Sequence, residues 1–162
     1  MKNLVRMAAL AAAVTAVATP ASAQVSANPP ARARVNVVKP LALEQVSDLH
    51  FGNVIVWDSG TVQLATDGSI TCPSQLDCDD NGTAAQYRVR GTNGYTVTVT
   101  ATDSTLTNGT TNILFSPDAP ATVPLTNSGQ AGVVFNVGGS VAIPANATGG
   151  LYVGDMDVTV EY

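Results

Sequence analysis

Short runs in which apolar and polar residues alternate make up most of this chain. In Tyr95–Thr100 the two valines share one face with Tyr95, and three threonines form the other face. Successive side chains of a β-strand point to opposite faces of a sheet, so this period of two predicts half-buried strands. The predicted strands, all rich in residues that favour β-structure, are Arg34–Val38, Leu41–Val46, Asn53–Trp57, Thr61–Ala65, Ser69–Cys72, Ala85–Arg90, Tyr95–Thr102, Asn112–Phe115, Thr122–Leu125, Gly132–Val137, Ser140–Ile143 and Leu151–Tyr162.

Turn residues separate these runs. Asp67-Gly68 and Asn108-Gly109 fit two-residue hairpin loops, which favour Asn or Asp followed by Gly, and Asp58-Ser59-Gly60 could close another hairpin. No stretch of twelve or more residues after residue 23 repeats its apolar positions with a helical period. The chain is therefore predicted to be all-β: an antiparallel, immunoglobulin-like β-sandwich without substantial helix.

The last predicted strand shows the clearest alternation. One face carries Tyr152, Gly154, Met156, Val158, Val160 and Tyr162, and the opposite face carries the acidic residues. A shift of one residue would bury the acidic side chains, so we expect a fixed register for this strand. The terminal aromatic residue indicates that the C-terminus is part of the core.

The N-terminus reads as a secretory signal peptide over residues 1–23. Lys2 and Arg6 precede an apolar run that is too short to span a bilayer, and Ala21-Ser22-Ala23 resembles a cleavage site. We expect export to the periplasm, the cell surface or the medium. Residues 24–33, which contain Pro29-Pro30, are predicted to form an extended arm, and residues 34–162 the sandwich domain.

Charge excludes several classes of function. Loss of Lys2 and Arg6 with the signal peptide leaves five basic residues against twelve acidic ones, a net charge of −7. An acidic chain with so few cations is unsuited to nucleic acid or to anionic lipid. No later apolar run is long enough to span a membrane. Hydrophobic residues make up 45% of the chain, which is too many for a disordered protein.

Two cysteines and an acidic run form the first candidate site. Cys72 and Cys78 are the only cysteines, and in an exported protein such a close pair is predicted to form a disulfide. Asp77, Asp79 and Asn81 match the first half of a calcium loop, whose hard cation needs oxygen ligands at alternate positions. The twelfth position is Arg88 instead of the usual Glu. Calcium is thus a weak candidate beside a solvated acidic hairpin, and no other cofactor is expected.

Residues for catalysis are scarce. His50 is the sole histidine, and it stands near no serine or cysteine in a protease-like or hydrolase-like motif. We therefore expect a protein that is not an enzyme, with a site hidden on loops as the alternative.

Three stretches carry a family resemblance: Val35–Leu43, with its P-L-x-L motif, Leu49–Val54, with L-x-F-G, and Gly149–Tyr162, with G-x-Y-x-G-x-x-x-V-x-V-x-Y. They resemble the short secreted bacterial proteins grouped as domain of unknown function 4402. The resemblance implies a β-sandwich outside the cytoplasm and supplies no catalytic residues. The C-terminal stretch is also similar to the last strand of chaperone–usher pilin and spore-coat-U-like subunits, which implies a pilin-like sandwich.

The predicted function is that of a structural or interaction protein of the cell surface, such as a fibre, coat or biofilm-matrix subunit. A sandwich with an open edge presents unpaired backbone groups, and an extended segment of itself or of another surface subunit can complete it by strand addition. The candidate residues for entering such an edge, in cis or in a neighbour, are Val35, Val37, Leu41 and Leu43. Two alternatives stay open: this segment is the domain's own first strand, or the protein is a small ligand- or calcium-binding module.

Overall fold

The computed structural model describes residues 24–79, 81–126, 129 and 131–162, and the predicted signal peptide over residues 1–23 lies outside them. The chain divides into two units, Met1–Asn36 and Val37–Tyr162. Residues 24–40 are exposed and have no strand or helix. The predicted strand Arg34–Val38 is therefore absent. A strand needs a hydrogen-bonded neighbouring strand, and no strand in the part of the chain that the structure describes forms a sheet with this run.

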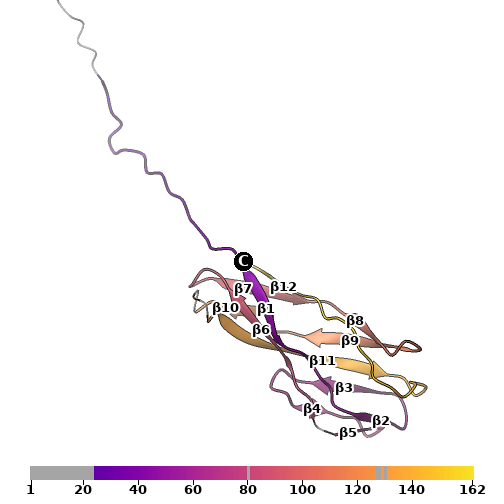
Figure 1. The fold of residues 1–162 in the computed structure, drawn as a ribbon. Coiled ribbons are helices and arrows are strands. Elements are labelled where there is room, and N and C mark those ends of the chain that lie inside the picture. Colours follow the sequence, from indigo (N-terminus) through magenta and orange to yellow (C-terminus); the bar gives the residue numbers. More distant parts are fainter. Residues whose placement is uncertain (1–23, 80, 127–128, 130) are drawn as a thin grey trace, which may run out of the picture. The chain divides into compact units, whose positions relative to one another are not determined.

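The second unit is built from strands, and none of the described residues is helical (Figure 1). All the strand pairs are antiparallel. The strands in chain order are β1 (Ala42–Ser47), β2 (Val54–Val56), β3 (Gly60–Leu64), β4 (Ile70–Thr71), β5 (Leu76–Cys78), β6 (Ala85–Arg90), β7 (Thr96–Ala101), β8 (Ser104–Thr107), β9 (Asn112–Asp118), β10 (Thr122–Pro124), β11 (Val133–Ile143) and β12 (Val158–Glu161). The predicted all-β, antiparallel class is confirmed.

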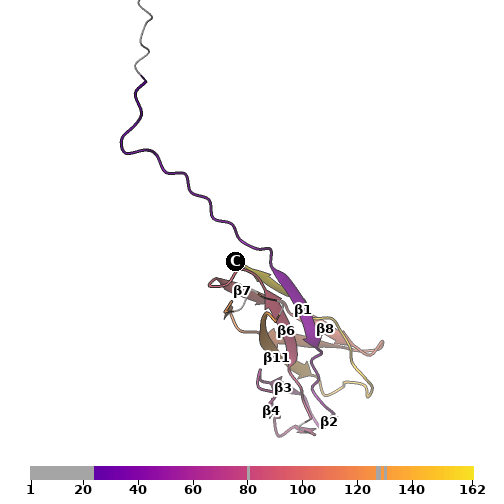
Figure 2. The ribbon, with the colours of Figure 1, turned by 60° about the vertical axis from the view of Figure 1, so that its left-hand side comes forward.

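The longest strand, β11, connects two halves of the sandwich. Its residues 133–137 pair with β6, which pairs in turn with β1. Its residues 138–143 pair with β9 on one side and with β3 on the other. Figures 1 and 2 show β1, β6 and β11 side by side. Two smaller sheets, β10-β7-β12 and β2-β5, supply the facing layers.

Each half has its own core. The first core lies between β1-β6-β11 and β10-β7-β12, where alternate side chains of both sheets are buried: Ala85, Tyr87, Val89, Val97, Val99, Val123, Leu125, Phe135 and Val137. The second core lies between the β4-β3-β11-β9-β8 sheet and the β2-β5 pair: Val62, Leu76, Ile113, Phe115, Val141 and Ile143. Leu49 and Met156 pack against both cores. These two facing layers make the fold a β-sandwich.

Several predicted boundaries differ from the structure. Gly132–Val137 and Ser140–Ile143 are two halves of the single strand β11. Asp58-Ser59-Gly60 joins β2 to β3, which lie in different sheets, so it closes no hairpin. The Asn108-Gly109 loop is longer than two residues, because Thr107 pairs with Asn112. Short strands β5 and β8 were not predicted because runs of three or four residues carry too little alternation.

The predicted last strand Leu151–Tyr162 is regular only over β12. Its alternation nevertheless holds, since Tyr152, Met156, Val158 and Val160 are each less exposed than their neighbours. Tyr162 is 45% exposed, so it is not the core residue that the pattern predicted. Its hydroxyl accepts a hydrogen bond from the Thr92 backbone N–H (2.7 Å) and donates one to the Lys39 carbonyl oxygen (2.6 Å).

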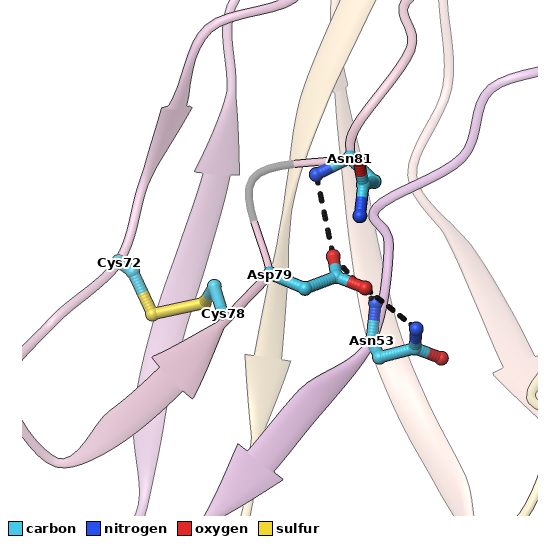
Figure 3. The surroundings of a disulfide bond; sticks show 5 residues. All are labelled: Asn53, Cys72, Cys78, Asp79 and Asn81. Atoms are coloured by element: carbon cyan, nitrogen blue, oxygen red, sulfur yellow. Dashed lines mark hydrogen bonds between the residues drawn. A yellow bond between two sulfur atoms is a disulfide. The ribbon is translucent and has the colours of Figure 1, made fainter.

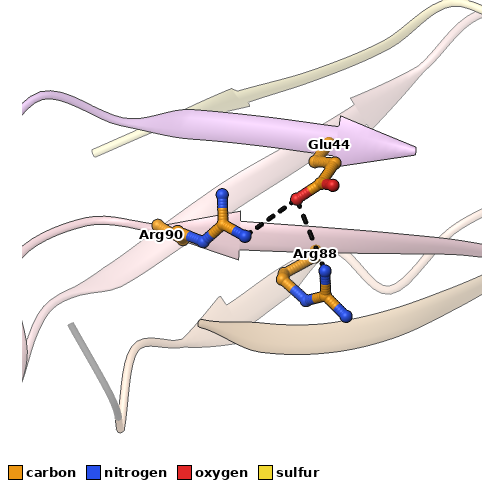
Figure 4. A network of polar contacts seen from close by, with 3 residues as sticks. All are labelled: Glu44, Arg88 and Arg90. Atoms are coloured by element: carbon orange, nitrogen blue, oxygen red, sulfur yellow. Dashed lines mark hydrogen bonds and ion pairs between the residues drawn. The ribbon is translucent and has the colours of Figure 1, made fainter. Parts of the chain in front are cut away.

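An ion-pair network fastens the first strand to its neighbour. The Glu44 carboxylate on β1 accepts from Arg90 (2.8 Å) and from Arg88 (3.4 Å), both on β6 (Figure 4). The three side chains are partly exposed, so the network is worth at most about 1 kcal/mol. It nevertheless adds to the β1–β6 hydrogen bonds, which indicates that β1 is the domain's own first strand.

Candidate functional site

A groove of about 1170 Å³ opens over the second core. Its floor includes Ile113 and Phe115 of β9, and Val141 and Ile143 of β11. Its two walls are the segments 45–56 and 147–156, which are far apart in the sequence. The groove thus lies where the β2-β5 pair covers only part of the second core.

The first wall takes its shape from Leu49–Asn53. His50 exchanges two backbone hydrogen bonds with Thr83 (2.9 and 2.7 Å), and its Nδ1 accepts from the Gly52 N–H (2.8 Å). Gly52 has a φ of +79°, and a Cβ here would lie 2.2 Å from a carboxylate oxygen of Asp79, so the position requires glycine. Phe51 then packs edge to face on Phe115, with ring centroids 6.0 Å apart. The hydrogen bonds of His50 to Gly52 and Thr83 thus give this histidine a structural role in the wall.

Asp79 holds Asn53, the last residue of the segment Leu49–Asn53, in place through hydrogen bonds. Its carboxylate accepts from the backbone N–H of Asn53 (3.0 Å), from the Asn53 side-chain amide (2.5 Å) and from the Asn81 N–H (3.3 Å), as Figure 3 shows. The backbone hydrogen bond from Asn53 is the main cause that lowers the pKa of Asp79 from its ordinary value. The carboxylate is therefore charged at neutral pH and serves as a loop anchor.

The predicted disulfide between Cys72 and Cys78 is present, next to this anchor (Figure 3). It joins the residue after β4 to the end of β5, and both half-cystines pack against the second core. In a loop of this size the chain-entropy model gives a stabilisation of roughly 2 kcal/mol. The bond holds β5, and with it β2, in place beside the groove.

The calcium candidates are arranged around the same loop. Asp77 is exposed on β5, opposite Ile55 of β2, whereas Asp79 and Asn81 are hydrogen-bonded to each other. Among residues 24–79, 81–126, 129 and 131–162, no three His, Cys, Asp or Glu side chains are grouped as a metal site. Calcium binding by this loop stays a prediction.

The second wall is the segment before β12. Tyr152 is hydrogen-bonded through its hydroxyl to the side chain of Thr111 and to the Thr148 carbonyl oxygen, and the Thr111 contact is the main cause that lowers the tyrosine's pKa. Val153 exchanges backbone hydrogen bonds with Thr107 of β8 (2.8 and 3.0 Å). Gly154 passes so close to β8 that a Cβ would lie 2.5 Å from the Thr105 carbonyl oxygen.

Both walls leave backbone groups without a backbone partner. Of residues 151–156, only Val153 makes a backbone–backbone hydrogen bond within the described chain. On the opposite wall, Leu49 and Phe51 likewise make none with any described residue. The groove therefore has an apolar floor and two walls whose backbone is incompletely hydrogen-bonded to the described chain, and such backbone groups can pair with an added strand.

The four strand-addition candidates fall into two groups. Leu41 and Leu43 pack against the first core of their own domain. Val35 and Val37 are 87% and 80% exposed. Alternation predicts the same role for all four residues, because it does not show where a segment stops pairing with its own domain. The groove itself was not predicted, although L-x-F-G and G-x-Y-x-G, the motifs behind the family resemblance, supply its two walls.

Comparison with known proteins gives one match. No curated protein and no solved structure matches the chain. No helix among the described residues has the length and apolar character needed to cross a membrane. The family model described as Domain of unknown function (DUF4402) matches residues 41–162, which include β1, both walls of the groove and β12. Because this match spans most of the chain, the protein belongs to the DUF4402 family.

Proposed function

We propose that the protein is exported and acts as a structural subunit outside the cytoplasm, joined to other subunits by β-strand addition. It carries out no reaction in this proposal. The observation that carries it is the groove over the second core, with its apolar floor and its two walls of incompletely paired backbone. An extended segment laid between such walls gains main-chain hydrogen bonds along its length and buries alternate side chains.

The surroundings of the groove support this proposal. The Cys72–Cys78 disulfide and the Asp79 anchor fix one wall, and the hydrogen bonds of Tyr152 and Val153 fix the other. Walls held in place before binding lower the entropic cost of receiving a strand. His50, the sole histidine, has its Nδ1 engaged by the Gly52 N–H. The side chains at the groove thus support recognition of an extended chain.

The test combines assembly state with hydrogen exchange. The exported protein is examined by size exclusion with light scattering and by electron microscopy over a range of concentrations. We expect assemblies larger than a monomer, in which the amides of 49–53 and 151–156 exchange more slowly than in the monomer. The amides of β6, which are paired on both sides, serve as the control because they are protected in both states. A protein that stays monomeric throughout, with rapid exchange in both walls, would contradict the proposal.

A small-ligand module is the second candidate, and the volume of the groove is the observation that favours it. At about 1170 Å³ the groove slightly exceeds the range of roughly 300–1,000 Å³ that is usual for ligand pockets, so it has room for a small ligand. This function predicts that the protein remains monomeric while a bound apolar or glycan ligand raises its melting temperature. The same measurements therefore separate the two candidates.

A further inference from the structure

We infer that the groove selects an extended segment with a basic side chain, and that this side chain is bound by the hydroxyl of Tyr87 and the carboxylates of Asp48 and Asp155. The inference rests on the proposed function, and it adds the chemical class of the partner segment. That segment carries apolar residues along the floor of the groove and a lysine or arginine at the end where Tyr87 lies.

Tyr87 is a buried polar residue at the junction of the two cores. It lies on β6, opposite Phe135 of β11, and the two rings stack with centroids 5.9 Å apart. The residue is only 7% exposed and belongs to the first core, yet it also lines the groove over the second core. The floor residues Val141 and Ile143 follow further along β11. Tyr87 therefore marks the end of the groove nearest the first core.

The hydroxyl of Tyr87 has no hydrogen-bond partner among the residues that the structure describes. A buried hydroxyl that stays unpaired lowers stability, because it loses its bonds to water and gains none in return. A phenylalanine would make the same ring contact with Phe135 without that loss. The unpaired hydroxyl at the groove thus points to a ligand that hydrogen-bonds to it.

The charges around the groove indicate the sign of that ligand. Asp48 of the first wall and Asp155 of the second wall are exposed carboxylates that line the groove. Neither forms an ion pair with a described residue, and no described lysine or arginine lines the groove. The Gln45 side-chain amide donates a hydrogen bond to Asp48 (2.5 Å), which leaves the negative charge in place. Two unneutralised carboxylates favour a cation.

The carboxylates also act on the tyrosine itself. Burial is the main cause that raises the pKa of Tyr87, and the negative charges of Asp48 and Asp157 raise it further. The hydroxyl is therefore neutral at neutral pH, with an oxygen that accepts hydrogen bonds. A cationic N–H group can donate to this oxygen while the carboxylates attract its charge. A segment laid between the two walls brings side chains to this place, so a lysine or arginine of that segment supplies the cation.

The experiment measures binding of synthetic peptides to the full exported chain by calorimetry. Each peptide has about nine residues of alternating valine and threonine, with a lysine at its first or last position to cover both strand directions. The matched peptides carry acetyl-lysine, which keeps the length and removes the charge. We expect one lysine peptide to bind at least roughly tenfold more tightly than its acetylated form. Slower hydrogen exchange in 49–53 and 151–156 shows that it occupies the groove.

Variants of the protein test the three binding groups. Asp48→Asn and Asp155→Asn combined should remove most of the preference for the lysine peptide. Asp103→Asn and Asp118→Asn combined are the matched control, because both carboxylates are exposed and neither lines the groove. Tyr87→Phe should reduce the preference while its melting temperature equals or exceeds that of the parent, since only an unpaired hydroxyl is removed. A purely structural role of this hydroxyl predicts the opposite pair of results.

The outcomes separate this inference from the proposed function. If lysine and acetyl-lysine peptides bind the groove equally well, or if the control variant loses as much preference as the groove variant, the basic side chain is not selected and strand addition stands. If no peptide binds, the inference is overturned. If the protein also stays monomeric at all concentrations, the proposed function fails with it.

Discussion

At the scale of single residues, Tyr162 shows how an exposed aromatic can matter for stability. Its hydroxyl connects the Thr92 backbone to the Lys39 carbonyl, and its ring meets that of Tyr95 edge to face, with centroids 5.4 Å apart. The three contacts bring together residues that are far apart in the sequence. The hydroxyl therefore holds the entry of the domain, the loop after β6 and the end of the chain in one place.

We predict that Tyr162→Phe lowers the free energy of unfolding by about 1 kcal/mol, because a backbone N–H and a carbonyl each lose a partner while the ring contact is kept. Urea unfolding followed by fluorescence measures the change. Tyr162→Leu, which also removes the ring, should cost more. Equal stability of Tyr162→Phe and the parent would show that water replaces the hydroxyl without cost.

Other residues at the site show what a sequence pattern reveals and what it hides. The expected export and the close spacing of Cys72 and Cys78 predicted a disulfide, and the bond is present. Gly52 and Gly154 stood inside recognisable motifs, but their role is close approach to Asp79 and to β8. A glycine is needed at such a position because another part of the chain lies against it in the folded protein. The local sequence does not show which part of the chain that is, so the walls of the groove could not be predicted.

At the scale of elements, β11 is the central strand of the sandwich. Alternation predicted both of its halves, yet it did not predict that one strand crosses from the first core to the second. The strand that pairs with β11 changes at Gly138-Gly139: β6 pairs with β11 up to Val137, and β9 pairs with it from Gly138 onward. A Cβ on Gly138 would lie 2.2 Å from the Leu64 carbonyl oxygen, so β3 can approach only because the side chain is absent.

We predict that Gly138→Ala destabilises the protein by at least about 1–3 kcal/mol, the usual cost of overpacking, because the opposing atom is backbone and cannot rotate away. Gly149→Ala is the matched control, since no atom lies within 4 Å of a Cβ at that position. Thermal denaturation of both variants measures the difference. Equal melting temperatures would mean that β3 and β11 separate without cost.

The groove wall before β12 belongs to the same scale. Alternation over residues 151–162 predicted one regular strand, and the less exposed positions agree with it. The regular part nevertheless begins only at Val158. Alternation records which side chains face the interior, but a segment with one neighbour has the same alternation as a segment with two. A missing neighbour, which is what makes the groove, is therefore invisible in the sequence.

At the scale of the second unit, the two cores are physically continuous. β11 contributes buried residues to both of them, and Leu49 and Met156 pack against both. Neither half can lose its packing without exposing apolar surface of the other. The all-β class was predictable from the sequence because alternation pervades the chain, whereas the division into two joined cores depends on strand order.

We predict a single unfolding transition for the second unit. Far-UV circular dichroism reports the strands, and the fluorescence of Trp57, which directly follows β2, reports the second half. The two melting curves should coincide within error. Reduction of the disulfide should lower their common midpoint without separating them. Two resolved midpoints would show that the cores unfold independently.

The groove over the second core has a geometric consequence for the proposed strand addition. A segment that enters the groove from another copy would come from a different surface of that copy, so the contact would be heterologous. Unless the rotation between copies closed a ring, such a contact would propagate as an open filament. The two tips of that filament would differ chemically, because one would present an empty acceptor groove and the other an unused donor segment. A protein that carries only one of these features would stop growth at one tip and leave the other free to extend.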